Sequence, residues 1–287
     1  MKTLETSTAI SFKNILFLTD FTEASKAACS YALAFGRSFG ARLYPAHVVE
    51  PVIPGELETP VTPEVVTNIE NQKRRELADL VKNAGLDYQG LVAEGAIETI
   101  VTAWTAEHGI DLIVIGTHGR KGMERLFLGS TAESIFRAAN CPVLTVGPNV
   151  RPSPSAELKL NKVLFATSLT KEAEPALSYA LSFARGCDAK LTILHVVQTD
   201  TAPYLASDLA WEKLRKIVEE EGGDLAHKPE FFVGEGDADR RILEHAQRER
   251  PDLIVLGLSQ EKTSTHFRRG IASKVVSLAS CPVLTVR

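Results

Sequence analysis

The pattern of apolar and polar positions at the start of the chain predicts a strand followed by a helix. Residues 14 to 19 form a short continuous apolar run, typical of a strand that is covered on both faces. After Thr22, which can cap a helix, small and aromatic residues recur at helical spacing until Gly40. Glycine tolerates the left-handed backbone that ends many helices, so we expect this helix to end at Gly40.

The same alternation of strand and helix continues to about residue 147. Apolar runs predict further strands at 42–49, near 86–93, at 112–115 and at 143–146. Between them we expect a proline-rich loop at 51–63, a polar helix through Lys82, and helices near 98–108 and 130–139. Strands that alternate with helices pair in parallel through right-handed crossovers. The pattern therefore predicts an α/β fold, a doubly wound parallel sheet in a three-layer α/β/α sandwich.

The chain contains this unit twice. Residues 13–49 align without a gap with residues 161–197, and the two stretches share Leu-Phe, Ser-Tyr-Ala-Leu and His-Val-Val at matched positions. Later in each copy, Asp-Leu-Ile-Val and Cys-Pro-Val-Leu-Thr-Val recur. We therefore expect one domain at 12–147, a second at 161–287, and between them a linker at 148–160 whose first part holds three prolines.

Composition and charge narrow the class of protein. The 287 residues carry a formal net charge of −4, and no Lys/Arg tract is dense enough to predict nucleic-acid binding. No apolar run has the length of a membrane span, and the first residues lack the apolar stretch of a secretory signal. The four cysteines form no CxxC pair, and no cluster has metal-ligand spacing. We expect a cytoplasmic protein with reduced thiols, no membrane contact and no resident metal.

The loop after the fourth strand has the features of an anion site. Glycines at Gly116, Gly119 and Gly129 let the backbone approach a ligand closely, and the helix predicted from Ser130 points its free N–H groups at the same place. Arg120 adds a positive charge. The loop lacks the GxxxxGK[ST] sequence of a P-loop, and the first turn lacks the GxGxxG sequence of a dinucleotide-binding fold.

The glycine spacing, together with an aspartate after the first strand, resembles the universal stress protein family in its tandem two-domain form. The resemblance covers both copies and implies two tandem five-stranded parallel sheets of the adenine nucleotide alpha hydrolase-like type. It also implies an adenine nucleotide, ATP or AMP, in the first copy, with any Mg²⁺ arriving with the nucleotide. By position, the binding residues implied are Thr19, Asp20, Val48, Gly116, His118, Gly119, Arg120, Gly129, Ser130 and Thr131.

The family pattern gives these residues distinct roles. Asp20 would contact the ribose, and a carboxylate at a strand end is chemically suited to accept hydrogen bonds from ribose hydroxyls. Val48 would meet the adenine through its backbone. Gly116 and Gly119 would let the loop pass beside the ribose and phosphates, and the Gly129–Ser130 step would hold phosphates at the helix start. His118 lies in the loop, where it is either a phosphate contact or a solvated side chain.

The second copy departs from this pattern. Ser168 aligns with Asp20, Gln260 replaces Gly119, and Arg269 replaces Gly129. Glu261 adds a negative charge where phosphate would sit. We therefore expect weak nucleotide binding, or none, in the second copy.

Three functions remain open at this stage. The first is a nucleotide-responsive stress regulator that acts on a protein partner as yet unknown. The second is a weak ATPase or autokinase, although Asp20 and His118 are the sole candidate bases near the loop and we assign no catalytic residue. The third is a nucleotide-independent scaffold. The family resemblance also implies that residues 143–146 and 283–286 pair within the chain, while a homodimer of the whole chain stays open.

Overall fold

A computed structural model describes residues 10–49, 63–117, 132, 134–136, 139–153, 155–170, 173–197, 208–213, 215–216, 225–258 and 270–287. The strands of the first half are β1 (Asn14–Leu18), β2 (Arg42–Val49), β3 (Leu91–Glu94), β4 (Leu112–Gly116) and β5 (Val143–Val146). Those of the second half are β6 (Lys162–Thr167), β7 (Lys190–Val197), β8 (Glu230–Glu235), β9 (Leu253–Gly257) and β10 (Val283–Val286).

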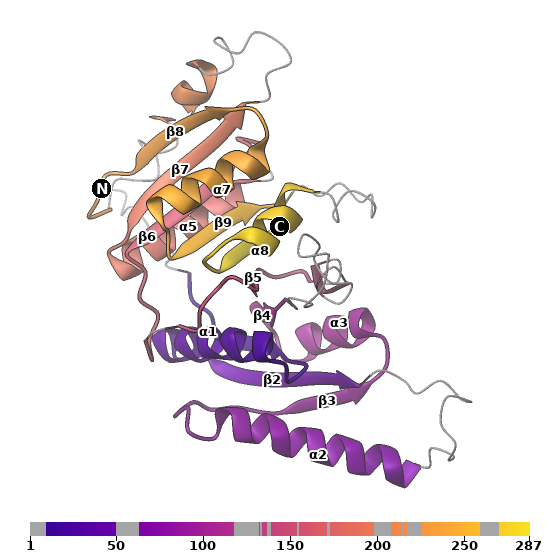
Figure 1. Ribbon diagram of the computed structural model, residues 1–287. Coiled ribbons are helices and arrows are strands. Elements are labelled where there is room, and N and C mark those ends of the chain that lie inside the picture. The colour runs from indigo at the N-terminus through magenta and orange to yellow at the C-terminus, as the bar shows by residue number, and fades with distance from the viewer. Residues whose placement is uncertain are drawn as a thin grey trace, which may run out of the picture.

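Helices cover both faces of these strands (Figure 1). In the first half they are α1 (Glu23–Phe39), α2 (Pro63–Val81) and α3 (Ile97–Glu107), and in the second α5 (Glu174–Cys187), α7 (Ala238–Glu249) and α8 (Ile271–Leu278). Ala132 and residues 134–136 are also helical. The α/β sandwich predicted from the alternating pattern is confirmed.

The described strands form one continuous ten-stranded sheet in the order β3-β2-β1-β4-β5-β10-β9-β6-β7-β8. Within each half all strand pairs are parallel. The two halves join where β5 and β10 pair antiparallel, with Leu144 opposite Leu284. Because these two leucines occupy matched positions in the duplicated sequence, they lie at a pseudo-twofold axis between the halves.

Side chains of β1 alternate between two hydrophobic cores, one on each face of the sheet. Ile15 and Phe17 lie in the core that includes residues of α1 and α5, whereas Leu16 and Leu18 lie in the core that includes residues of α3, α7 and α8. Both cores extend across the two halves. A strand that is buried on both faces reads as an unbroken apolar run, which explains the pattern at 14–19.

The predicted ends of α1 are confirmed. Thr22 is its N-cap, and Gly40 ends it in the left-handed conformation with φ 63°. The third strand begins later than predicted, at Leu91, because only Tyr88 of the preceding segment forms a bridge to β2, opposite Leu43. That bridge keeps the register that β2 and β3 share further along.

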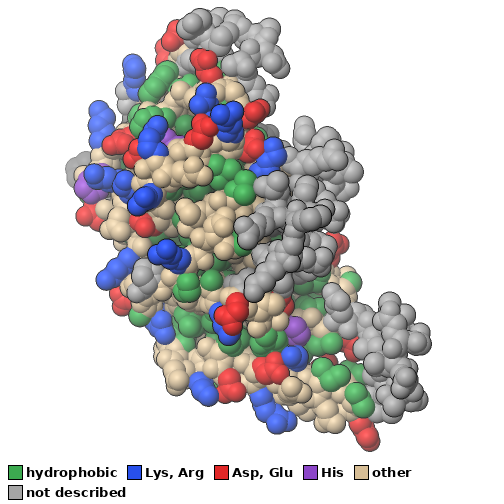
Figure 2. Space-filling model, in the orientation of Figure 1, with side chains coloured by type: hydrophobic (Ala, Val, Ile, Leu, Met, Phe, Trp, Pro, Cys, Tyr) green, Lys and Arg blue, Asp and Glu red, His purple; other side chains and the backbone are tan. Residues whose placement is uncertain are grey.

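The segment between the halves contacts the helices beside it. The backbone N–H of Ser153 donates to Ser30 Oγ (2.7 Å), and that of Leu158 donates to Ser38 Oγ (2.7 Å). Lys and Arg side chains lie interspersed with Asp and Glu on the face of the molecule shown in Figure 2. Among the described residues, no helix is both long and apolar enough to cross a membrane.

Candidate nucleotide site

The carboxyl ends of three adjacent strands form the candidate site in the first half. β1 lies between β2 and β4, and the chain runs outward from β1 in both directions, so this is the switch point where open α/β sheets bind ligands. The N–H of Thr19 donates to the carbonyl of Ala46 on β2 (3.0 Å), and that of Thr117 donates to Val146 on β5 (3.0 Å). These bonds hold the ends of β1 and β4 at the same edge.

The turn that follows β1 has a constrained backbone. Phe21 has a φ of 63°, a left-handed conformation that a non-glycine residue adopts only when its surroundings hold it there. The buried hydroxyl of Thr19 accepts the Phe21 N–H (3.0 Å). The side chain of Thr19 therefore stabilises the turn that presents Asp20.

Asp20 is held by its neighbours. Its Oδ1 accepts hydrogen bonds from the Thr22 N–H (3.1 Å), from the Thr22 hydroxyl (2.7 Å) and from the Ser25 hydroxyl. The carboxylate is half-buried beside the first turn of α1, where the helix dipole favours negative charge. The arrangement fixes a carboxylate acceptor at the strand end.

Two residues that sequence reasoning did not place at the site lie beside this turn. His47 donates from Nδ1 to the carbonyl of Thr19 (2.7 Å), and its ring centroid lies 4.9 Å from that of Phe21. Lys73 of α2 places Nζ 4.6 Å from the Phe21 ring centroid, and its hydrogen bond to Glu76 lowers the pKa of that carboxyl. His47 could be recognised from its repetition as His195, but nothing in the local sequence pointed to Lys73.

Thr117 is a third residue that sequence reasoning missed. It directly follows β4 and is buried, and its hydroxyl oxygen has no hydrogen-bond partner within the described part of the chain. A buried hydroxyl without a partner costs free energy, so it marks a place where a further group can bind. Its counterpart in the second half is Leu258. This replacement of a polar residue by an apolar one is the feature of the sequence from which Thr117 could have been recognised.

The structure brings together four of the ten predicted nucleotide-binding residues: Thr19, Asp20, Val48 and Gly116 stand at or just beyond the ends of β1, β2 and β4. The other six, His118, Gly119, Arg120, Gly129, Ser130 and Thr131, lie outside the described residues.

The second half repeats the scaffold of this edge without its carboxylate. Leu169 has a φ of 57° and donates its N–H to the Thr167 hydroxyl (3.0 Å), as Phe21 does to Thr19. His195 donates from Nδ1 to the Thr167 carbonyl (2.8 Å). At the position of Asp20, the hydroxyl of Ser168 lies 3.0 Å from that of Thr170. The histidines therefore serve the turn in both halves, whereas the carboxylate belongs to the first half.

The cysteines and acidic residues show no metal or redox centre in the part of the chain that is described. No group of three or more His, Cys, Asp or Glu side chains there is placed to hold a metal ion. All four cysteines are free thiols. Burial raises the pKa of Cys141 and of Cys281 to about 12, which suppresses the reactive thiolate.

Comparison with known proteins gives a consistent family. The model of the universal stress protein family matches residues 11–147 and again 159–287. A universal stress protein of Thermus aquaticus is 35% identical over 142 residues, which cover 47% of this chain and 98% of that protein.

Two further relatives match both halves. A universal stress protein of Mycolicibacterium smegmatis is 24% identical over 295 residues, covering 95% of this chain and 96% of its own. The crystal structure of a universal stress protein from Archaeoglobus fulgidus has the same fold, with a TM-score of 0.74 at 19% identity, covering 96% of this chain and 97% of that one. This chain therefore belongs to the universal stress protein family, whose sequence pattern it carries twice in tandem.

Proposed function

We propose that the first half binds an adenine nucleotide, ATP or AMP, at the carboxyl ends of β1, β2 and β4, and that the chain acts as a cytoplasmic, nucleotide-responsive stress regulator. The observation that carries the proposal is the fixed carboxylate of Asp20 just beyond β1, at the switch point; Thr117, just beyond the adjacent strand β4, adds a buried hydroxyl without a partner among the described residues. The glycine-rich loop that begins at Gly116 would supply the phosphate contacts.

The comparison between halves supports a ligand role for Asp20. The turn keeps its backbone conformation, its threonine hydrogen bond and its histidine when serine stands in place of aspartate. The carboxylate is therefore dispensable for the turn itself. A half-buried charge that the turn does not require is more readily explained by a ligand with hydroxyl donors, such as a ribose.

A regulatory role fits this arrangement better than dedicated catalysis. Oδ1 of Asp20 already accepts three hydrogen bonds from the turn and the helix start, so this oxygen is engaged with the protein rather than open to a reacting water. A bound nucleotide would act by favouring one of two conformations, to the extent that it binds them with different affinity. Any Mg²⁺ would be held chiefly by the phosphates.

The test exchanges residues between the halves. D20S and G119Q each place in the first half the residue that the second half has, and S168A is the matched control in the second half. Loss of a hydrogen bond to a charged group costs about 1.5–3 kcal/mol. Calorimetric titration with ATP and AMP should therefore show D20S binding about 10- to 150-fold more weakly, with S168A unchanged.

Two outcomes would contradict the proposal. Equal affinity in D20S and S168A would remove Asp20 from the site, and absence of binding in the unaltered chain would remove the site altogether. Circular dichroism of D20S checks that its fold is intact. Phosphate release that falls in D20S and in S130A would instead favour the ATPase.

A further inference from the structure

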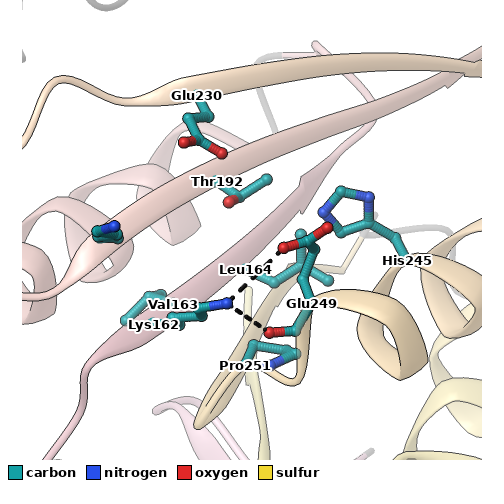
Figure 3. Close-up of a pocket in the computed structure, with 9 residues that line it drawn as sticks. Lys162, Val163, Leu164, Thr192, Glu230, His245, Glu249 and Pro251 are labelled. Carbon is teal, nitrogen blue, oxygen red and sulfur yellow. Dashed lines mark hydrogen bonds and ion pairs between the residues drawn. The ribbon is translucent and has the colours of Figure 1, made fainter.

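A hollow lies in the second half of the molecule, at the amino ends of its strands. Its volume is about 130 Å³, and it opens at the amino ends of β6, β7 and β8 beside the end of α7 (Figure 3). The residues that line it and that the argument uses are Lys162, Lys190, Thr192, Glu230, His245 and Glu249. The proposed nucleotide site lies at the carboxyl edge of the other half, so this cavity is independent of it.

The first half shows why the hollow exists. The duplicated sequence aligns Tyr44 with Thr192 and Trp104 with His245. In the first half both aromatic rings are buried, with Tyr44 4% and Trp104 8% exposed, and the Tyr44 ring stacks on His108 with centroids 4.8 Å apart. Replacing two large rings by smaller polar side chains leaves the space that the second half presents as a cavity.

His245 lines this space, and its ring carries a buried nitrogen without a hydrogen-bond partner among the described residues. The residue is 6% exposed, and its Nδ1 lies 3.1 Å from Nη2 of Arg248. A guanidinium only donates, so Nδ1 accepts and the proton of the neutral ring resides on Nε2. Nε2 is buried and has no partner in the described part of the chain. Figure 3 shows the ring pointing from α7 into the cavity, toward Thr192 and Glu249.

Charged groups of both signs surround the cavity. Lys162 Nζ binds the backbone carbonyl of Glu249 (2.8 Å) and lies 3.7 Å from its carboxylate. The side chains of Lys190 and Glu230, by contrast, make no hydrogen bond or salt bridge with other described residues, and both are exposed. Glu230 pairs in register with Thr192, so its carboxylate and the Lys190 ammonium stand on neighbouring strands.

We propose that this cavity binds a small zwitterion of the amino-acid type. Its carboxylate would accept from the Nε2–H of His245 and from Lys190, and its ammonium would pair with Glu230. A cavity of about 150 Å³ accommodates benzene, so the volume here admits a molecule of about six heavy atoms, the size of a small amino acid. The donor without a partner then gains one, and both unpaired charges at the rim are balanced.

The experiment uses the full chain and L-serine as the probe. Titration is followed by calorimetry and by the side-chain imidazole signals in ¹H–¹⁵N NMR spectra, with the His245 signals identified from H245Q. L-serine should shift those signals saturably, whereas acetate and ethylammonium, each with one charge, should bind more weakly. K190A should weaken L-serine binding about tenfold, since one charge-assisted hydrogen bond is lost.

Two variants control the result. T192Y/H245W copies the first half and should abolish binding by filling the space, while R42A, at the first-half position that aligns with Lys190, should leave it unchanged. If T192Y/H245W does not fold, the contrast between K190A and R42A decides. The proposal is overturned if no probe binds, if acetate binds as tightly as L-serine, or if K190A and R42A have the same affinity.

Discussion

Truncating Phe183 should weaken the first half of the molecule, although Phe183 belongs to the second. Phe183 of α5 is 3% exposed, and its ring centroid lies 5.9 Å from that of Phe35, 6.3 Å from that of Phe12 and 6.4 Å from that of Phe39. Phe35 and Phe183 occupy matched positions of the duplication, so this contact lies at the pseudo-twofold axis, as the Leu144–Leu284 pair does.

The magnitude follows from these contacts. A buried Phe→Ala change costs about 3–5 kcal/mol in free energy of unfolding. Each aromatic pair contributes about 0.5–1.5 kcal/mol beyond the area it buries. Phe183 forms three such pairs with rings of the first half, so at least about 1.5 kcal/mol of the lost stability comes from contacts with the first half. In a cycle of F35A, F183A and the double variant, we expect a coupling energy of about 0.5–1.5 kcal/mol.

The chain offers a probe for each half. It has two tryptophans, Trp104 in the first half and Trp211 in the second, so in a W211F background the fluorescence reports the first half alone. Urea unfolding in that background should show F183A lowering the midpoint of the Trp104 transition. F165A is the matched control, because Phe165 is a buried ring of the second half without a ring contact to the first among the described residues.

The reasoning is refuted if F183A leaves the Trp104 transition where it was. It is also refuted if F165A lowers that transition as much as F183A does, because the halves would then be coupled through general cooperativity. Additivity of F35A and F183A within about 0.3–0.5 kcal/mol would show that the two rings act independently.

Three further outcomes follow from local geometry. In G147A, the new Cβ would lie 2.5 Å from the carbonyl oxygen of Val276, so the free energy of unfolding should fall by about 1–3 kcal/mol in a thermal melt; an unchanged melt would contradict this clash. Cys141 and Cys281, with pKa values of about 12, should react with iodoacetamide at pH 8 far more slowly in the folded chain than in urea, by mass spectrometry. Burial lowers the pKa of His245, so the unfolded state binds the extra proton first; stability should fall as the pH drops below about 6.5, and less so in H245Q.

Much of the fold could be predicted because its signals are local. Thr22 and Gly40 end α1 through hydrogen bonds and backbone angles that involve only neighbouring residues. The apolar run at 14–19 reports burial on both faces of a strand, whichever elements cover it. The repeated His47 also indicated a structural role, since the second half keeps it without the carboxylate.

The remaining features depend on residues that are far apart in the sequence. The contact between Lys73 and Phe21 requires α2 to lie beside the β1–α1 turn, and no periodicity encodes that placement. The cavity near His245 arises from the joint absence of two rings on separate elements, so it becomes visible only when the halves are compared in space. Likewise, the duplication indicated that Phe35 and Phe183 are equivalent, but not that they touch.

At their junction the two halves restrict each other's residues, whereas the outer edges of each half are free to differ. This explains why the residues that could bind ligands differ between the halves at those edges. Residues at the junction contact their own counterparts, so a change in one copy disturbs both sides of the axis at once. The outer edges carry no such restriction. The aspartate at the carboxyl edge of the first half could be lost in the second because the turn is held by threonine and histidine. The large aromatic side chains at the amino edge could be lost in the second half because β6, β7 and β8 remain paired beside the space. A ligand bound at either edge can therefore influence the other half through the common sheet, through the two cores that extend across both halves, and through the ring cluster around Phe183.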